Sequence, residues 1–180
     1  MNQHRPRAAL ISGSPSPHSK SRALLELAGE RLDAAGFATT TIDLAALPAD
    51  ALLGRKKDAR VEEALVAVGA ADVVVASSPV YRATFSGLLK VFFDLLPRNG
   101  LEGKIGVPIL TGASPDHRLA LDHGFRPLFA SVGAVVVANG VYGWDAQFTP
   151  APAAGLAALV GRAIDEAVAS ARTTVLQGEV

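Results

Sequence analysis

Apolar and polar residues follow one another along this chain in blocks that predict strands and helices in regular alternation. Short apolar or β-branched runs have the composition of buried parallel strands at 8–11, 39–43, 72–76, 105–110 and 134–138. Apolar residues recur at helical spacing over 21–35, 58–70, 85–96, 117–130 and 150–171. A strand followed by a helix, five times over, predicts an α/β three-layer sandwich around a five-stranded parallel sheet, which we expect to form one domain over residues 1–180.

A polar loop with the sequence SGSPSPHSKS, at 12–21, joins the first predicted strand to the first predicted helix. It contains five serines, one glycine and two prolines, and it has no acidic residue. Backbone N–H groups and hydroxyls in such a loop converge on one point, and the following helix adds the positive end of its dipole, so the loop suits an anion such as phosphate. The same serines are typical of a simple helix N-cap. From the loop alone, both interpretations stay open.

Two further loops, at 77–84 and 111–116, follow the third and fourth predicted strands and are also rich in Ser, Thr, Gly or Pro. In an open parallel sheet, ligands bind beyond the carboxyl ends of the strands, near the point where the strand order reverses. A phosphate at the first loop and a planar ring at the other two is the arrangement expected for a mononucleotide.

The composition excludes several other classes of site. Lys plus Arg (17) balances Asp plus Glu (17), which argues against a nucleic-acid groove or an anionic membrane as partner, and the absence of cysteine excludes disulfides and thiolate chemistry. The chain has no G-x-G-x-x-G, P-loop or G-x-S-x-G motif. Glycines interrupt the uncharged stretch 127–144, which favours a buried strand over a membrane span. The N-terminus does not resemble a signal peptide, so we expect a cytoplasmic location.

Two groups of polar residues leave a choice of interpretation. The pairs Asp116-His117 and Asp122-His123 suggest a metal, but six residues at about 100° each place the two imidazoles on different sides of a helix, so we expect no metal site. The segment 44–57 has no clear pattern, and its basic residues 55–57 suit either a nucleotide phosphate or, as we expect, a solvated loop.

Three groups of motifs give the chain a resemblance to a known family. They are GSPS at 13–16 with Ser19 and Ser21; PVY at 79–81 followed by SGLLK at 86–90 and DLLP at 94–97; and HRLALD at 117–122 leading to RPL at 126–128. With these motifs, over roughly residues 8–150, the chain resembles the NADPH-dependent FMN reductases, most closely those of sulfonate assimilation. The resemblance implies a flavodoxin-like fold with strand order 2-1-3-4-5, an enzyme that reduces FMN with NADPH, and release of the reduced flavin to a partner monooxygenase.

The resemblance also implies a role for individual residues. The FMN phosphate would be held by Ser14, Ser19, Lys20 and Ser21. The isoalloxazine ring would be lined by Pro79, Val80 and Tyr81, with Thr111, Gly112 and Ala113 at its far edge. The backbone amides from Val80 to Arg82 would bias the electronics of the flavin, whereas Ser86 is expected to cap the following helix.

Two positions depart from the family pattern. Ala113 stands where many relatives have a second glycine, and His123 stands where some relatives insert an aromatic residue as a π-bulge at a subunit interface. His123 is either an ordinary interface histidine or a residue with a role in flavin exchange.

The implied chemistry is hydride transfer from the nicotinamide to the flavin, which needs no nucleophile, metal or catalytic side chain from the protein. Cations available for the 2′-phosphate of NADPH are Arg22, Arg82 and Arg118. The alternatives are an FMN-retaining quinone or azo reductase and a flavodoxin-like electron carrier, although carriers of that kind are usually strongly acidic. The predicted helix at 85–96 is apolar on several faces, so we expect a homodimer or homotetramer.

Overall fold

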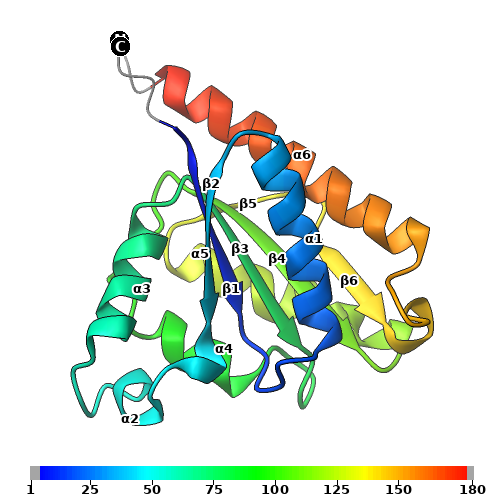
Figure 1. Ribbon diagram of the computed structural model, residues 1–180, viewed down its shortest axis with the longest axis horizontal. Coiled ribbons are helices and arrows are strands. Elements are labelled where there is room, and N and C mark those ends of the chain that lie inside the picture. Colours follow the sequence, from blue (N-terminus) through cyan, green and yellow to red (C-terminus); the bar gives the residue numbers. More distant parts are fainter. Residues whose placement is uncertain (1–4, 178–180) are drawn as a thin grey trace.

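The computed structural model describes residues 5–177 and is a three-layer sandwich with a parallel sheet between two layers of helices (Figure 1). The strands are β1 (Arg7–Ser12), β2 (Ala38–Asp43), β3 (Val73–Pro79), β4 (Ile105–Gly112), β5 (Val135–Val136) and β6 (Val141–Trp144). The α-helices are α1 (Lys20–Ala34), α2 (Ala49–Leu52), α3 (Ala59–Gly69), α4 (Gly87–Phe93), α5 (Arg126–Ser131) and α6 (Ala154–Gln177). The strands run in the order β2-β1-β3-β4-β5, which confirms the predicted order, and β6 pairs with β4.

Both faces of the sheet are buried, which explains why its central strands are almost continuously apolar. Alternate residues of β1 face opposite helical layers. Ala8 and Leu10 belong to the core beneath α1 and α6, whereas Ala9 and Ile11 belong to the core beneath α3, α4 and α5 (Figure 1). Because β1, β3 and β4 are parallel neighbours, their carboxyl ends meet at one edge of the sheet.

Serine side chains cap the two helices that begin next to that edge. Ser19 is the N-cap of α1, since its Oγ accepts a hydrogen bond from the backbone N–H of Arg22. Ser86 is the N-cap of α4 and accepts from the N–H of Leu89, as expected. Gly36 follows the end of α1 with a φ of +90°, the left-handed conformation that favours glycine after a helix.

Several predicted boundaries were wrong because tertiary pairing overrides local pattern. The segment 77–79, predicted as loop, extends β3, because Ser77 pairs with Ser12 of β1 and Pro79 pairs with Thr111 of β4. The segment 44–57 contains a 3₁₀ turn, η1 (Leu44–Ala46), followed by α2, and the basic residues 55–57 lie exposed after α2.

The predicted helix at 117–130 is divided into three unlike parts. A 3₁₀ turn, η2 (Pro115–Arg118), is followed by a π-helix, η3 (Leu121–Phe125), and then by α5. The π-helix contains His123, so the structure has a π-helical segment at the position where the family resemblance suggests a π-bulge. The predicted helices at 85–96 and 150–171 are α4, which is shorter, and α6, which begins later and extends further.

The strand predicted at 134–138 is two residues long, and β6 lies in a stretch predicted as loop. The chain leaves the sheet between the two strands because charged side chains bind its backbone there. Arg126 donates to the carbonyls of Val137 and Ala138, while the Glu166 carboxylate accepts from the N–H groups of Ala138 and Asn139. The sheet therefore has a sixth strand, which alternation of sequence did not predict.

Within residues 5–177, no helix is long and apolar enough to cross a membrane. The same residues bring together no group of three His, Cys, Asp or Glu side chains able to hold a metal ion.

Candidate functional site

The three polar loops predicted to share a ligand do lie at one edge of the sheet. Pairing along β1, β3 and β4 sets Ser12 beside Ser77 and Pro79 beside Thr111. Hydrogen bonds then join the loops themselves, since the N–H of Gly13 donates to the carbonyl of Ser77 (2.8 Å) and that of Val80 donates to the carbonyl of Thr111 (2.7 Å). The loops form one continuous polar rim.

The first loop packs its backbone directly onto the start of α4. The Ser86 hydroxyl donates to the carbonyl of Gly13, and a Cβ atom at position 13 would lie 2.9 Å from Cβ of Leu89 and 3.0 Å from the Ser77 carbonyl oxygen. No side chain fits at position 13, because real Cβ atoms do not approach other heavy atoms so closely. The glycine is thus required by a close approach rather than by an unusual φ angle.

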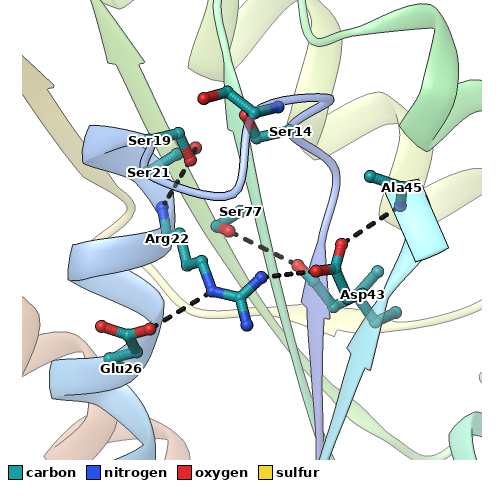
Figure 2. Close-up of polar contacts among 10 residues, drawn as sticks. Ser14, Ser19, Ser21, Arg22, Glu26, Asp43, Ala45 and Ser77 are labelled. Carbon is teal, nitrogen blue, oxygen red and sulfur yellow. Dashed lines mark hydrogen bonds and ion pairs between the residues drawn. The ribbon is translucent and has the colours of Figure 1, made fainter.

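Hydroxyl groups line the loop and the start of α1 (Figure 2). Ser14 and Ser21 are buried, the Oγ atoms of Ser19 and Ser21 lie 3.2 Å apart, and Ser14 Oγ accepts from the N–H of Ser16 at 3.1 Å. The first turn of α1 contains no acidic residue. Neutral donors at the positive end of a helix dipole favour a bound anion.

Ser12 is a candidate ligand that the family resemblance did not suggest. Its side chain is 1% exposed, and its Oγ is the buried side-chain polar atom without a hydrogen-bond partner among residues 5–177. A buried hydroxyl without a partner costs about 1–3 kcal/mol. A phosphate oxygen at this loop would supply the missing partner, so the residues present fit such a group. The sequence does contain a signal for this role, because Ser12 is the first residue of the polar loop at 12–21.

Arg22 is engaged by carboxylates rather than by the loop. Its guanidinium bonds Asp43 at 2.5 Å and Glu26 at 3.3 Å, and Figure 2 shows it reaching away from the serine hydroxyls toward the end of β2. The hydrogen bond to Asp43 is the main reason why the pKa of Arg22 is raised, and burial opposes it only in part. Asp43 also accepts from the N–H of Ala45. Arg22 therefore joins α1 to β2.

Lys20 is also paired, although at the opposite side of the loop. Its Nζ lies 2.9 Å from Oδ1 of Asp145 and 5.6 Å from the centroid of the Phe148 ring. Both partners follow β6, and Asp145 begins a 3₁₀ turn, η4 (Asp145–Gln147). A groove of about 300 Å³ runs along this junction and is lined in part by Pro17, Phe148 and Pro150.

The second loop ends in a tight turn at 81–84. Tyr81 and Thr84 exchange backbone hydrogen bonds, while Arg82 and Ala83 have φ angles of +50° and +71°. Two successive positive φ angles define a type I′ turn, which glycine and asparagine prefer. The turn exposes the side chains of Tyr81 and Arg82, while Val80 is half-buried.

The backbone amides of this loop are only partly available to a ligand. Val80 donates to Thr111 and Tyr81 donates to Thr84, whereas the N–H of Arg82 has no acceptor in the part of the chain that the structure describes. Of the three amides expected to contact the flavin, the structure therefore leaves only that of Arg82 free.

The π-helix η3 packs against the same turn. A Cβ atom at Gly124 would collide with Oγ1 of Thr84, and the rings of Phe85 and Phe125 contact each other at a tilt of 43°, with centroids 5.6 Å apart. His123, in the middle of η3, is exposed. The segment that carries His123 is thus in direct contact with the loop that carries Tyr81.

A tyrosine of strand β6 supports the third loop. The Tyr142 hydroxyl donates to the carbonyl of Ser114, and a side chain at Gly112 would collide with that hydroxyl. Burial is the main cause that raises the pKa of Tyr142, and the charges of Asp145 and Asp116 add to it. Tyr142 therefore stays a neutral donor. Thr111 is buried, whereas Ala113 is exposed at the rim.

Two further hollows of the surface lie away from this rim. One, of about 550 Å³, is lined in part by Arg7, Ala38, Glu63 and Val66, near the amino ends of β1 and β2. Another, of about 300 Å³, lies beside the basic residues 55–57 and the start of α3. The side chains of residues 55–57 form no ion pair with the described residues, so both interpretations of these cations stay open.

The sheet order and the three loops at its carboxyl edge define a flavodoxin-like protein with a candidate mononucleotide site. A flavodoxin from Streptococcus pneumoniae has the same fold, with a TM-score of 0.63 at 16% identity over 90% of this chain and 97% of its own. Residues 6–149 match the family model of NADPH-dependent FMN reductase. The chain belongs to this family, and it is an oxidoreductase that uses FMN and a nicotinamide nucleotide.

Individual relatives agree with this assignment. An FMN reductase (NADPH) from Pseudomonas putida strain KT2440 is 38% identical over 157 residues, which are 87% of this chain and 79% of that protein. The apo crystal structure of an NADH:FMN oxidoreductase superposes with a TM-score of 0.85 at 37% identity and covers 93% of this chain and 90% of that chain.

Proposed function

We propose that this protein reduces FMN by hydride transfer from a nicotinamide nucleotide and releases the reduced flavin to a partner monooxygenase. The single observation that carries the proposal is the rim formed by the loops at 12–21, 77–84 and 111–116, in which a buried hydroxyl, Ser12 Oγ, lacks a partner. The transfer of reduced flavin to a monooxygenase rests on the family resemblance alone.

In this proposal the first loop binds the phosphate of FMN. Ser14, Ser19 and Ser21 surround the start of α1, and Ser12 adds a hydroxyl from the end of β1. These groups are neutral, so they would hold a dianion by hydrogen bonds and by the helix dipole, and Lys20, the cation of this loop, would add its charge.

The second and third loops would hold the flavin ring. Pro79, Val80 and Tyr81 would line one side of the ring and Thr111, Gly112 and Ala113 its far edge. Bound FMN supplies the hydride acceptor. The chain contributes orientation, because the hydrogen bond between Val80 and Thr111 and the type I′ turn hold both loops before any ligand arrives.

The nicotinamide nucleotide would approach from the exposed side of the rim. Arg82 and Arg118 are exposed and form no side-chain hydrogen bond or ion pair within residues 5–177, so they are the better candidates for the 2′-phosphate of NADPH. Arg22 is already bonded to Asp43 and Glu26. We therefore assign Arg22 a structural role.

A flavin-dependent oxidation assay tests the proposal. Purified protein is mixed with NADPH or NADH, with and without free FMN, and the absorbance of the reduced nicotinamide is followed. We expect oxidation only when FMN is present. Absence of FMN-dependent oxidation with both nucleotides would contradict the proposal, and tight FMN binding without oxidation would favour a flavodoxin-like electron carrier.

Gel filtration separates release of FMN from retention. A protein that releases its flavin emerges colourless after one passage, whereas an FMN-retaining quinone or azo reductase stays yellow and turns over quinones faster than free flavin. We expect the colourless outcome.

Assembly into a homodimer or homotetramer and a location in the cytoplasm are further parts of the proposal. The apolar residues of α4 do not support assembly as the sequence suggested, because Leu89, Phe92 and Phe93 are buried and Leu88 and Val91 pack on the same core. The better support is the exposure of two large apolar side chains, Tyr81 (49%) in the second loop of the rim and Leu119 (64%) directly after η2.

A further inference from the structure

Lys20 lies where a cation would most strengthen binding of a phosphate. It is the only Lys or Arg in the loop at 12–21, and it is the first residue of α1, directly after the N-cap Ser19. Its ammonium would add a charge-assisted hydrogen bond to the neutral hydroxyls of the loop.

In the structure, the Lys20 ammonium is paired with a carboxylate of the same chain. Asp145 Oδ1 lies 2.9 Å from Lys20 Nζ, and the face of Phe148 packs near the same ammonium. These two residues come from the segment after β6, far along the chain from the loop. The salt bridge is half-exposed, with 41% of the Lys20 side chain and 58% of the Asp145 side chain accessible, so it can exchange with a competing anion.

We propose that Asp145 lowers the affinity of the site for FMN by competing with the flavin phosphate for the ammonium of Lys20. This inference rests on the proposed function, in which FMN binds with its phosphate at the loop. A reductase that hands its flavin to another protein must release that flavin, and a carboxylate that recaptures Lys20 as the phosphate leaves favours release.

Competition predicts an effect that depends on the phosphate. Riboflavin has the same ring as FMN but no phosphate, so Lys20 and Asp145 should not influence its binding. Asp145→Asn keeps the size of the side chain and removes its charge. We expect this variant to bind FMN about two- to fivefold more tightly than the unchanged protein, the scale of an exposed ion pair, and to bind riboflavin equally well.

A double-mutant cycle measures the coupling between Lys20 and Asp145 in FMN binding. Dissociation constants for FMN and riboflavin are measured by flavin fluorescence for the unchanged protein, Asp145→Asn, Lys20→Gln and the double variant. Salt at about 0.15 M screens repulsion between more distant charges. We expect Lys20→Gln to weaken FMN binding, and we expect Asp145→Asn to have no effect when Lys20 is absent.

Asp165→Asn is the matched control. Asp165 forms a similarly exposed ion pair with Arg31, at the other end of α1 (side chains 56% and 54% exposed), so its loss should not change the ratio of the FMN and riboflavin constants. Unchanged or weaker FMN binding by Asp145→Asn would overturn the inference, and weaker binding would mean that Asp145 orients Lys20 onto the phosphate. Failure of the unchanged protein to bind either flavin would instead contradict the proposed function.

Discussion

At the scale of single residues, the site depends on glycines whose lack of a Cβ atom lets neighbouring elements pack closely. Gly13, Gly112 and Gly124 each occupy a place where a Cβ atom would collide with a neighbour, respectively Leu89, Tyr142 and Thr84. Each of these contacts joins one loop of the rim to another element. The glycines therefore set the spacing of the rim.

Gly13→Ala tests this directly. The added methyl group would meet Leu89 Cβ at 2.9 Å and the Ser77 carbonyl at 3.0 Å, and neither can move without shifting α4 or β3. We expect a loss of about 1–3 kcal/mol in the free energy of unfolding, measured with urea, together with weaker FMN binding. In Gly161→Ala, at an open position in α6, stability should instead rise by up to about 1 kcal/mol. Equal stability of Gly13→Ala and the unchanged protein would show that the loop is free to move.

At the scale of elements, the connection between β5 and β6 depends on one carboxylate from α6. Burial alone would raise the pKa of Glu166, but hydrogen bonds from the N–H groups of Ala138 and Asn139 and from the Asn139 side chain outweigh it, so the pKa is lowered. A group with a lowered folded-state pKa stabilises the fold above its unfolded-state pKa, and this contribution is lost as the pH falls through the folded-state value.

Glu166→Gln should therefore destabilise the protein in a pH-dependent way. At pH 7 we expect a loss of about 1 kcal/mol in the free energy of unfolding, because glutamine has one acceptor oxygen where the carboxylate uses both. One of the two backbone N–H groups therefore loses its acceptor, and the other bonds a neutral oxygen. The difference from the unchanged protein should shrink as the pH is lowered below the ordinary pKa of glutamate, 4.5. Urea unfolding at a series of pH values measures it, and a difference that grows toward acid pH would refute this account.

At the scale of the whole molecule, exposed apolar side chains lie near both ends of the sheet. Tyr81 belongs to the second loop of the candidate site and Leu119 directly follows η2, whereas Val66 (71% exposed) lines the groove near the amino ends of β1 and β2. The family resemblance suggests that His123 lies at a subunit interface. Because the π-helix that carries His123 is in direct contact with the loop that carries Tyr81, we expect this interface to lie beside the flavin site.

Leu119→Glu and Val66→Glu distinguish the two surfaces. At micromolar concentration we expect the unchanged protein to sediment as a dimer or tetramer. Leu119→Glu should shift it toward the monomer, because a charge would be buried without a partner in the interface. Val66→Glu should sediment like the unchanged protein. A monomeric unchanged protein would contradict the proposed assembly.

The sequence by itself determined the order of strands and helices and the loops that meet at the site. Those features follow from local rules, since apolar runs form the buried strands, and Ser19, Ser86 and Gly36 mark helix ends by short-range hydrogen bonding and backbone conformation. The family motifs added FMN and the nicotinamide nucleotide, which the matched family model supports.

Only the tertiary structure decided how the polar rim at 12–21 is completed. Whether Lys20 is free, whether Ser12 has a partner and whether the Val80 amide is available depend on segments remote in the chain, because Asp145, which follows β6, and the Thr111 carbonyl reach the loops by folding alone. The pattern of apolar and polar residues did not predict strand β6, because this strand forms through its pairing with β4. A sequence shows which groups a loop carries, but their partners are set by contacts in space.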